Sequence, residues 1–109
     1  MAEDSAANSQ IVLNVLYNEP TDPAAFEAYY AQTHLPLVDK IAGLANAVLI
    51  KGLPNPDGSK PAFYRIAQLY FDSAEQMAAS MGSPEGQAAV ADLANFATGG
   101  VTVVAGTTT

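Results

Sequence analysis

Apolar residues gather in four short stretches of the chain, each bounded by turn-forming residues. The stretches are 10–17 (QIVLNVLY), 45–53 (ANAVLIKGL), 62–71 (AFYRIAQLYF) and 99–107 (GGVTVVAGT). They are rich in β-branched and aromatic side chains, and segments such as NEPTDP and PNPDGSK follow them. This is the pattern of β-strands separated by turns. It predicts four strands, of which the second and third are joined by a long hairpin connection.

Between the first two stretches the apolar spacing changes to that of a helix. From residue 26 it follows i, i+3, i+4 and i+7, at Phe26, Tyr29, Tyr30 and Thr33. Asp22 is a good N-cap, and Pro23 suits the first helical position. Because Pro36 disfavours helical backbone at Leu35, we expect the helix to break or kink there and to continue as a second short turn that ends at Gly43.

Two more helices are predicted at 72–81 (DSAEQMAASM) and 83–97 (SPEGQAAVADLANFA), capped by Asp72 or Ser73 and by Ser83. The resulting order, β-α-β-β-α-β, is that of the α+β ferredoxin-like folds, with an antiparallel four-stranded sheet. We expect one domain at 10–106, a flexible N-terminal tail at 1–9 and a C-terminal tail at 107–109.

The predicted strands are apolar on both faces. In the first strand, Leu13 and Val15 point to one side, whereas Val12 and Leu16 point to the other. Two helices cover only one face of a four-stranded sheet, and a soluble chain rarely leaves a whole apolar face in water. We therefore expect the second face to meet another copy of the chain in a twofold homodimer. A different partner protein on that face is the alternative.

Composition removes several classes of function. The 109 residues include no cysteine and one histidine, so we expect no disulfide, no thiolate chemistry and no multi-histidine metal site. The formal net charge is −7 with only four Lys and Arg residues, which argues against nucleic acid and anionic membranes as partners. No apolar run approaches the roughly 20 residues that span a bilayer. The polar start MAEDSAANSQ does not resemble an export signal, so we expect a cytoplasmic protein.

The common catalytic motifs are also missing from the sequence. MGSPEG is not a nucleophile elbow, because no strand leads into it and its proline belongs to a helix start. No glycine-rich phosphate loop follows a strand, and the carboxylates lack calcium-loop spacing. We therefore do not expect a serine hydrolase, a nucleotide enzyme or a metalloprotease.

His34 is the strongest candidate for chemistry. It follows Phe26 and Tyr30 at intervals of four, so it ends an aromatic stripe on one side of the predicted helix. An imidazole titrates near neutral pH, and apolar walls that exclude water suit a general acid or base. The alternative is that His34 only caps the broken helix and hydrogen-bonds a carbonyl.

Four other side chains are candidates for ligand binding. Tyr29 and Tyr30 carry phenol hydroxyls that suit a ligand carbonyl or hydroxyl, although aromatic residues at helical spacing commonly pack in a core. Asn14 and Gln68 lie in the middle of apolar strands, so each belongs to a polar network or lines a cavity. We expect Arg65 to pair with a carboxylate. The remaining polar helix residues are expected to face solvent: Asp39, Asp92 and Asn95.

Three segments resemble the EthD family of small dimeric α/β-barrel proteins. They are VLYNEPTDPAAFEAYYAQTHLPLVDKIAGL, FYRIAQLYFDS and SPEGQAAVADLANFATGGVTVV, and the likeness runs from about residue 10 to 106. Its most specific pieces are FEAYYAQTHLPL and SPEGQAAVADLANFATGG. The resemblance implies a ferredoxin-like protomer whose sheet packs on that of a second protomer. It also places the histidine of the family's H-x-P segment at His34 and the proline at Pro36.

The resemblance further implies a hydrophobic pocket between sheet and helices. Relatives in this superfamily use such pockets as cofactor-free monooxygenases, polyketide cyclases, dehydratases and lactone isomerases. We expect a cofactor-free protein that binds a small hydrophobic or aromatic molecule, with His34 as acid or base in proton transfer or in oxygenation. Tyr29 and Tyr30 are expected to orient polar atoms, and the pocket walls are expected to be Phe26, Leu37 and Phe96. The alternatives are a non-catalytic binding or accessory protein of a degradation or oxidation pathway, and a dimer without a pocket.

Overall fold

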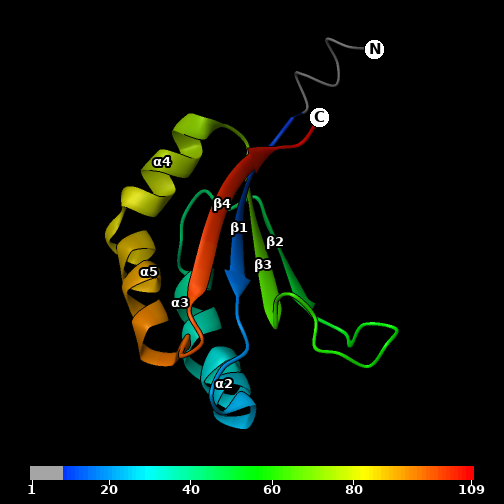
Figure 1. The fold of residues 1–109 in the computed structure, drawn as a ribbon. Coiled ribbons are helices and arrows are strands. Elements are labelled where there is room, and N and C mark those ends of the chain that lie inside the picture. Colours follow the sequence, from blue (N-terminus) through cyan, green and yellow to red (C-terminus); the bar gives the residue numbers. More distant parts are fainter. Residues whose placement is uncertain (1–8) are drawn as a thin grey trace.

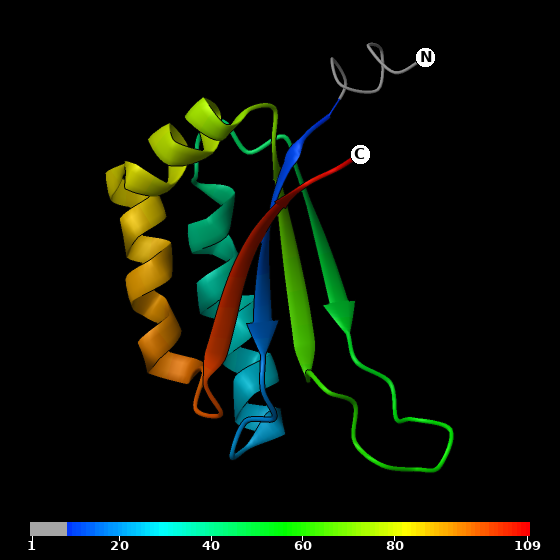
Figure 2. The same ribbon diagram turned by 45° about the horizontal axis from the view of Figure 1, so that its top comes forward.

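In the computed structural model, which describes residues 9–109, an antiparallel sheet carries the helices on one of its faces (Figures 1 and 2). The strands lie in the order β2-β3-β1-β4, with the bounds β1 (Ile11–Tyr17), β2 (Asn46–Lys51), β3 (Arg65–Phe71) and β4 (Val101–Thr107). The first connection is helical and comprises α2 (Pro23–Tyr29), the π-helical turn η1 (Tyr30–His34) and α3 (Leu35–Asp39). The last comprises α4 (Ala74–Gly82) and α5 (Pro84–Phe96). The predicted α+β ferredoxin-like fold is thereby confirmed.

Local sequence signals start the helices where they were expected. Asp22, Ser73 and Ser83 each accept a hydrogen bond from the backbone N–H three residues on, at 3.1, 3.0 and 3.1 Å. These bonds satisfy N–H groups that have no partner inside the helix. Of the two caps predicted for α4, the structure uses Ser73.

The helix was expected to break or kink at Leu35, and the break does not occur. Leu35 keeps helical backbone angles, φ −60° and ψ −38°, and its N–H donates to the carbonyl of Tyr30, five residues back. Such a π-helical turn holds one more residue than an α-helical turn, and it is often found at functional sites. The chain therefore accommodates Pro36 while it stays helical from α2 through α3.

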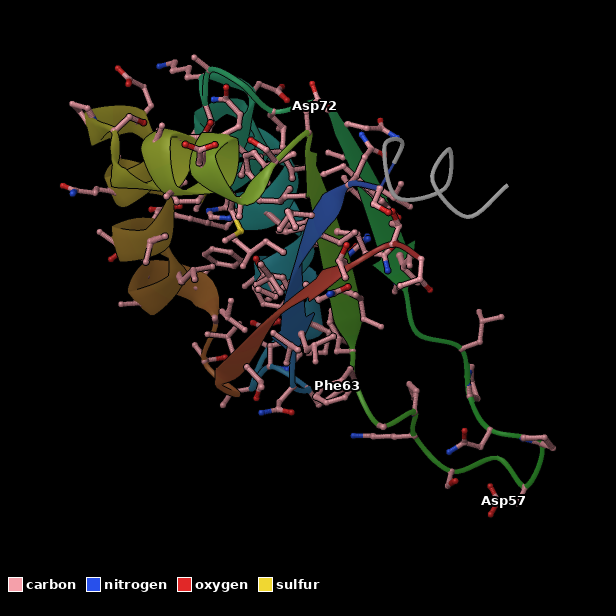
Figure 3. All side chains as sticks on the ribbon, turned by 90° about the horizontal axis from the view of Figure 1, so that it is seen from above. Asp57, Phe63 and Asp72 are labelled. Atoms are coloured by element: carbon pink, nitrogen blue, oxygen red, sulfur yellow. The ribbon has the colours of Figure 1, made fainter. Side chains whose placement is uncertain are left out.

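The hairpin connection and the chain ends differ slightly from the predicted bounds. β2 ends at Lys51 and β3 begins at Arg65, and the segment between them projects from the body around Asp57 (Figure 3). At the other end, the N–H of Thr108 donates to the carbonyl of Gln10 at 2.9 Å, so strand pairing reaches into the predicted C-terminal tail. Residues 1–8 of the predicted N-terminal tail lie outside the described residues. Within residues 9–109, no helix combines the length and apolar character needed to cross a membrane.

Two groups of side chains form the core between the sheet and the helices. One is mainly aromatic and includes Tyr17, Phe26 and Phe96, whereas the other is mainly aliphatic and includes Leu69 and Phe71. In the aromatic group, ring centroids lie 5.4 Å apart for Tyr17 and Phe26 and 5.1 Å apart for Phe26 and Phe96. These are favourable separations for aromatic pairs. The two groups meet beneath η1 and α3.

The opposite face of the sheet, here called the outer face, has no described helix over it. Ile50 and Val104 lie on it and are 37% and 49% exposed. A row of hydrogen bonds crosses its centre: Tyr70 donates to Gln68 at 3.3 Å, Gln68 to Asn14 at 3.2 Å, and Asn14 to the carbonyl of Val104 at 3.1 Å. Asn14 and Gln68 thus belong to a polar network, which was one of their two predicted alternatives.

Candidate functional site

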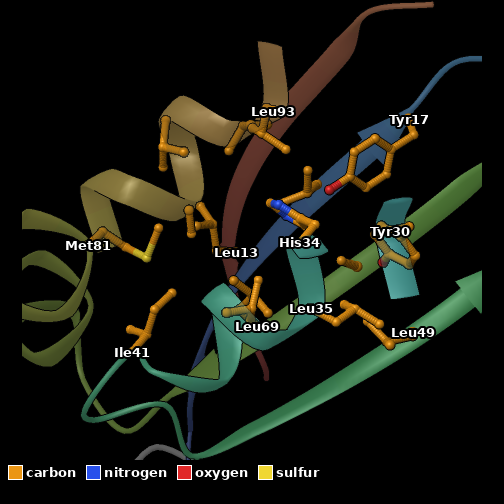
Figure 4. A pocket seen from close by; sticks show the side chains of 16 residues that line it. Leu13, Tyr17, Tyr30, His34, Leu35, Ile41, Leu49, Leu69, Met81 and Leu93 are labelled. Atoms are coloured by element: carbon orange, nitrogen blue, oxygen red, sulfur yellow. The ribbon is translucent and has the colours of Figure 1, made fainter. Parts of the chain in front are cut away.

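A cavity of about 170 Å³ lies between the sheet and the helices, where the two core groups meet (Figure 4). All four strands and the helices η1, α3, α4 and α5 contribute to its walls. Its lining is mainly hydrocarbon, and includes Leu13, Val38, Ile41, Leu49, Leu69 and Leu93. An apolar cavity of roughly 150 Å³ is known to accommodate benzene. The cavity therefore matches a molecule of about one ring.

His34 lies on the wall of this cavity, at the end of η1. It is 4% exposed, and its ring packs against Phe96 at 4.6 Å and against Tyr30 at 6.0 Å between centroids. Figure 4 shows the imidazole between Tyr17 and Leu13. Its side chain forms no helix cap. The aromatic stripe of the sequence thus places the chain's one histidine beside a cavity.

Asp92 of α5 holds the imidazole. His34 Nδ1 lies 3.0 Å from Asp92 Oδ2. The other carboxylate oxygen, Oδ1, accepts hydrogen bonds from the hydroxyl of Tyr29 at 2.6 Å and from the side-chain amide of Asn95 at 2.9 Å. Asp92 is therefore a buried group with three partners, which is how a carboxylate is tolerated away from water.

The expectation that Asp92 faces solvent is wrong, since it is 7% exposed. The spacing of the sequence could have predicted this burial. Asp92 lies three residues after Ala89 and four before Phe96, and both of these are buried. That spacing puts the carboxylate in the buried stripe of α5. Asn95 is exposed as predicted, although its amide reaches back to Asp92.

Burial and hydrogen bonding set the charges of the pair. Burial lowers the pKa of His34 below its ordinary 6.5, and the neighbouring Asp92 carboxylate opposes this only in part. Burial raises the pKa of Asp92, but hydrogen bonds from Tyr29, Asn95 and His34 outweigh it, so the net shift is downward. At neutral pH the pair is therefore a neutral imidazole beside a carboxylate.

These charges assign the ring proton. An ionised carboxylate only accepts hydrogen bonds, so the neutral imidazole carries its hydrogen on Nδ1 and donates it to Asp92. Nε2 then keeps a free lone pair on the other edge of the ring. His34 lines the cavity, so its ring belongs to the wall that a bound molecule would contact. The arrangement suits a general base whose orientation is fixed from behind.

Two phenols share the cavity wall with His34. Tyr17 is 1% exposed, and Figure 4 shows its hydroxyl directed toward His34. Tyr30 is 3% exposed, and within residues 9–109 its buried hydroxyl has no hydrogen-bond partner. Burial raises the pKa of Tyr30 to about 12 and also shifts the pKa of Tyr17 upward. Both phenols therefore stay protonated at neutral pH and are available as donors.

The other predicted site residues lie around the cavity or away from it. Of the predicted set, the cavity lining includes His34 and Tyr30. Tyr29 supports Asp92 from outside the cavity, and Phe26 and Phe96 form the aromatic core behind His34. Contrary to expectation, the lining includes neither the predicted walls Phe26, Leu37 and Phe96 nor the predicted binding residues Tyr29, Asn14 and Gln68. Asn14 and Gln68 are on the outer face because, in each strand, alternate residues point to opposite sides.

A second ionic cluster lies near Tyr30. Arg65 bonds both oxygens of Glu27, at 2.6 and 2.9 Å, and the hydroxyl of Tyr64 donates to Glu27 at 3.0 Å. The bond from Arg65 lowers the pKa of Glu27, although burial acts against it. The Arg65 guanidinium also lies 5.0 Å from the centroid of the Tyr30 ring. The predicted pairing of Arg65 with a carboxylate is confirmed. In the described part of the chain, no cluster of three His, Cys, Asp or Glu residues has the arrangement of a metal site.

Known proteins are similar to this chain in sequence and in fold. The model of the EthD domain matches residues 18–100. A protein of Rhodococcus erythropolis, named an uncharacterized 11.0 kDa protein in the thcB-thcC intergenic region, is 45% identical over 92 residues, which cover 84% of this chain and 88% of that protein.

Two solved structures are close relatives in shape. An EthD family protein of Bacillus halodurans C-125 has a TM-score of 0.83 and 33% identity, over 89% of this chain and 96% of the other. An EthD-like protein of Ralstonia eutropha JMP134 has a TM-score of 0.69 and 28% identity, over 93% and 91%.

More distant structures share the fold alone. They include a dimeric ferredoxin-like protein from Thermobifida fusca YX, with a TM-score of 0.68, 17% identity and 91% of both chains covered. SnoaB, a cofactor-independent oxygenase from Streptomyces nogalater, has a TM-score of 0.57 and 17% identity, over 94% of this chain and 93% of the other. The match to residues 18–100 and the identities of 45% and 33% show that the chain belongs to the EthD family.

Proposed function

We propose that the cavity binds a small, uncharged hydrophobic or aromatic molecule and that His34 transfers protons to and from it. The observation that carries the proposal is a neutral imidazole, held by a buried carboxylate, on the wall of a cavity of about 170 Å³. A buried titratable group in an apolar cavity is the usual mark of a functional site. Two phenols on the same wall support catalysis over a purely structural role for His34.

In this proposal Asp92 is a positioning residue. It holds Nδ1–H at 3.0 Å and so points Nε2 at the bound molecule. Nε2 accepts a proton from a carbon or oxygen atom, the electron pair of the broken bond stays on the substrate, and the imidazolium is stabilised by the carboxylate. Return of the proton to another atom completes an isomerisation, and its delivery to a leaving hydroxyl completes a dehydration. Cyclisation begins with the same deprotonation.

Cofactor-free oxygenation is a second reaction that uses this first step. Removal of a proton leaves an electron-rich substrate, which is the form that can react with oxygen directly. The cofactor-independent oxygenase of Streptomyces nogalater shares the fold, which supports this reaction as compatible with the architecture.

A non-catalytic role is the alternative function. The hydrocarbon lining of the cavity is favourable for holding a hydrophobic metabolite without turnover. In that role the protein would act as a binding or accessory component of a degradation or oxidation pathway, and His34 would only hydrogen-bond the ligand.

We also propose that the outer face forms a homodimer. Its apolar side chains include Ile50, 37% exposed, and Val104, 49% exposed, and exposed apolar faces of this kind commonly bind another protein. The fold relative from Thermobifida fusca is a dimer. Sedimentation equilibrium at micromolar concentration should give twice the mass of one chain. A monomer under these conditions would contradict the dimer.

The binding half of the proposal is tested with toluene, a one-ring hydrocarbon. NMR titration should show toluene shifting the signals of the single histidine ring. Leu69→Trp, which fills the cavity from β3, should remove this effect. If toluene leaves the His34 signals unchanged at concentrations near its solubility limit, the cavity does not bind such molecules and the proposal is wrong.

The catalytic half is tested with benzisoxazole, a small carbon acid. A base removes its C3 proton, the N–O bond breaks, and 2-cyanophenol forms and is followed by absorbance. Removal of a general base typically costs about 10²–10⁴ in rate. His34→Asn, whose amide nitrogen takes the place of Nδ1 beside Asp92, should therefore slow ring opening at least about a hundredfold while toluene binding stays within about threefold. Equal rates for the two proteins, with toluene binding intact, would favour the non-catalytic alternative.

A further inference from the structure

The hydroxyl of Tyr30 is the one buried side-chain oxygen or nitrogen without a hydrogen-bond partner in residues 9–109. Leaving such a group unpaired lowers the stability of the folded state. Native proteins seldom carry this cost unless a ligand or an ordered water completes the bond. Tyr30 also lines the cavity beside His34, so a molecule in that space is the candidate for the missing partner.

In the described structure, no group around Tyr30 accepts a hydrogen bond from its hydroxyl. Its ring packs among Phe26, Tyr17 and Phe96, at 5.4, 5.7 and 5.9 Å between centroids. Arg65, which lies over the ring, carries donors only. The nearest ionic cluster has its carboxylate, Glu27, already engaged by Arg65. We therefore look to a molecule in the cavity for the acceptor.

We propose that the ligand is an uncharged ketone or aldehyde of about one ring, whose carbonyl oxygen accepts a hydrogen bond from Tyr30. This inference rests on the proposed function and narrows its substrate class. A carbonyl oxygen is an acceptor without a donor, which is the complement of a phenol that stays protonated. A ligand carboxylate is disfavoured, because the cavity lining contains no Lys or Arg and Asp92 lies directly behind His34.

The same placement defines the reaction class. With the carbonyl oxygen on Tyr30, the neighbouring C–H bond is the acidic one, and Nε2 of His34 accepts its proton. The electron pair moves to the carbonyl oxygen to give an enolate, and the hydroxyl of Tyr30 stabilises the developing charge. Reprotonation at carbon or oxygen completes an exchange that needs no oxidant or reductant.

Two ligands of nearly equal shape test whether Tyr30 donates a hydrogen bond to a ligand carbonyl. They are cyclohexanone, and methylenecyclohexane, in which a CH₂ group replaces the carbonyl oxygen. Dissociation constants are measured by NMR titration for the wild-type protein, for Tyr30→Phe and for Tyr70→Phe. Tyr70 lies on the outer face, so its variant controls for loss of a tyrosine hydroxyl elsewhere.

Tyr30→Phe should weaken cyclohexanone binding about tenfold, which is the effect of one hydrogen bond in an apolar site. The dissociation constant of methylenecyclohexane should change by no more than about twofold, and Tyr70→Phe should change the dissociation constant of neither ligand. If Tyr30→Phe affects the two ligands equally, or neither, Tyr30 does not hold a carbonyl and this inference is overturned, while binding of methylenecyclohexane leaves the proposed function standing. If the wild-type protein binds neither of these ligands nor toluene, the proposed function itself fails.

Discussion

Two carboxylates of the helical layer each hold a nitrogen base, and the two pairs differ in what the base can do. Glu27 bonds Arg65 at 2.6 and 2.9 Å, and Asp92 bonds His34 at 3.0 Å. The side chains of Glu27 and Arg65 are 30% and 17% exposed, whereas those of Asp92 and His34 are 8% and 5% exposed. The first pair lies at the margin of the core, and the second lies inside it.

The difference separates a structural ion pair from a pair suited to chemistry. A guanidinium stays charged at all accessible pH values, so Arg65 can only hold α2 against β3. An imidazole exchanges its proton near neutrality, and His34 lies on the wall of a cavity. The geometry of the two contacts is similar, so the identity of the base and the space beside it decide the role.

The largest predicted effect is on the reaction rate, which should depend on Asp92 and not on Glu27. Asp92→Asn removes the charge that orients His34 and stabilises its imidazolium, so benzisoxazole opening should slow about a hundredfold. Glu27→Gln, the matched change in the other pair, should leave the rate within about twofold. Similar losses in both variants would mean that the two pairs act alike and that Asp92 has no special role.

The second prediction concerns stability. Here we expect a clear effect of Glu27→Gln, the variant that should leave the rate nearly unchanged. Glu27→Gln leaves the guanidinium of Arg65 without its charged partner at a half-buried position. A loss of about 1–2 kcal/mol in unfolding free energy is expected, between the values for surface and buried pairs. Urea denaturation followed by circular dichroism measures it. If the unfolding midpoint does not move, the Glu27–Arg65 contact is no more than an exposed surface pair.

The fold was predictable because its signals are local. Alternation in the strands, helical spacing after Asp22 and the caps at Ser73 and Ser83 each need only a few neighbouring residues. The exception was Pro36, whose effect on Leu35 was absorbed by a π-helical turn. A proline rule gives the local preference of the backbone, and the packing of η1 and α3 on the core overrides it.

The site was predictable only in part because it is built from distant segments. The aromatic stripe correctly drew attention to Tyr30 and His34, both of which line the cavity. Asp92, the partner of His34, lies 58 residues beyond it, and only tertiary packing brings α5 against η1. The side of the sheet that carries Asn14 followed from strand parity, but which side the helices cover did not. A cavity depends on volumes left unfilled, which no spacing in the sequence reports.

The third prediction concerns the pKa of His34, which NMR follows without ambiguity because the chain has one histidine. Its pKa should lie below 6.5, fall further in Asp92→Asn, and stay unchanged in Glu27→Gln. Since the unfolded chain takes up this proton first, stability should be unaffected by His34 above about pH 6.5 and should fall as pH drops from there toward the lowered pKa. A pKa above 6.5 would mean that Asp92 outweighs burial and that His34 is protonated near neutrality.

The smallest predicted effect is a difference in stability between two variants that each lose a tyrosine hydroxyl. Tyr64 bonds Glu27 of the first pair, and Tyr30 packs against His34 of the second. Tyr64 donates to Glu27 at 3.0 Å, so Tyr64→Phe should lower the unfolding free energy by about 1 kcal/mol. The hydroxyl of Tyr30 has no partner in the described chain, so Tyr30→Phe loses no hydrogen bond and should raise it by about 1 kcal/mol. Thermal unfolding of the ligand-free proteins should therefore shift in opposite directions. If Tyr30→Phe is destabilised like Tyr64→Phe, a bound water already satisfies the Tyr30 hydroxyl, and the cavity gives up that water when a ligand enters.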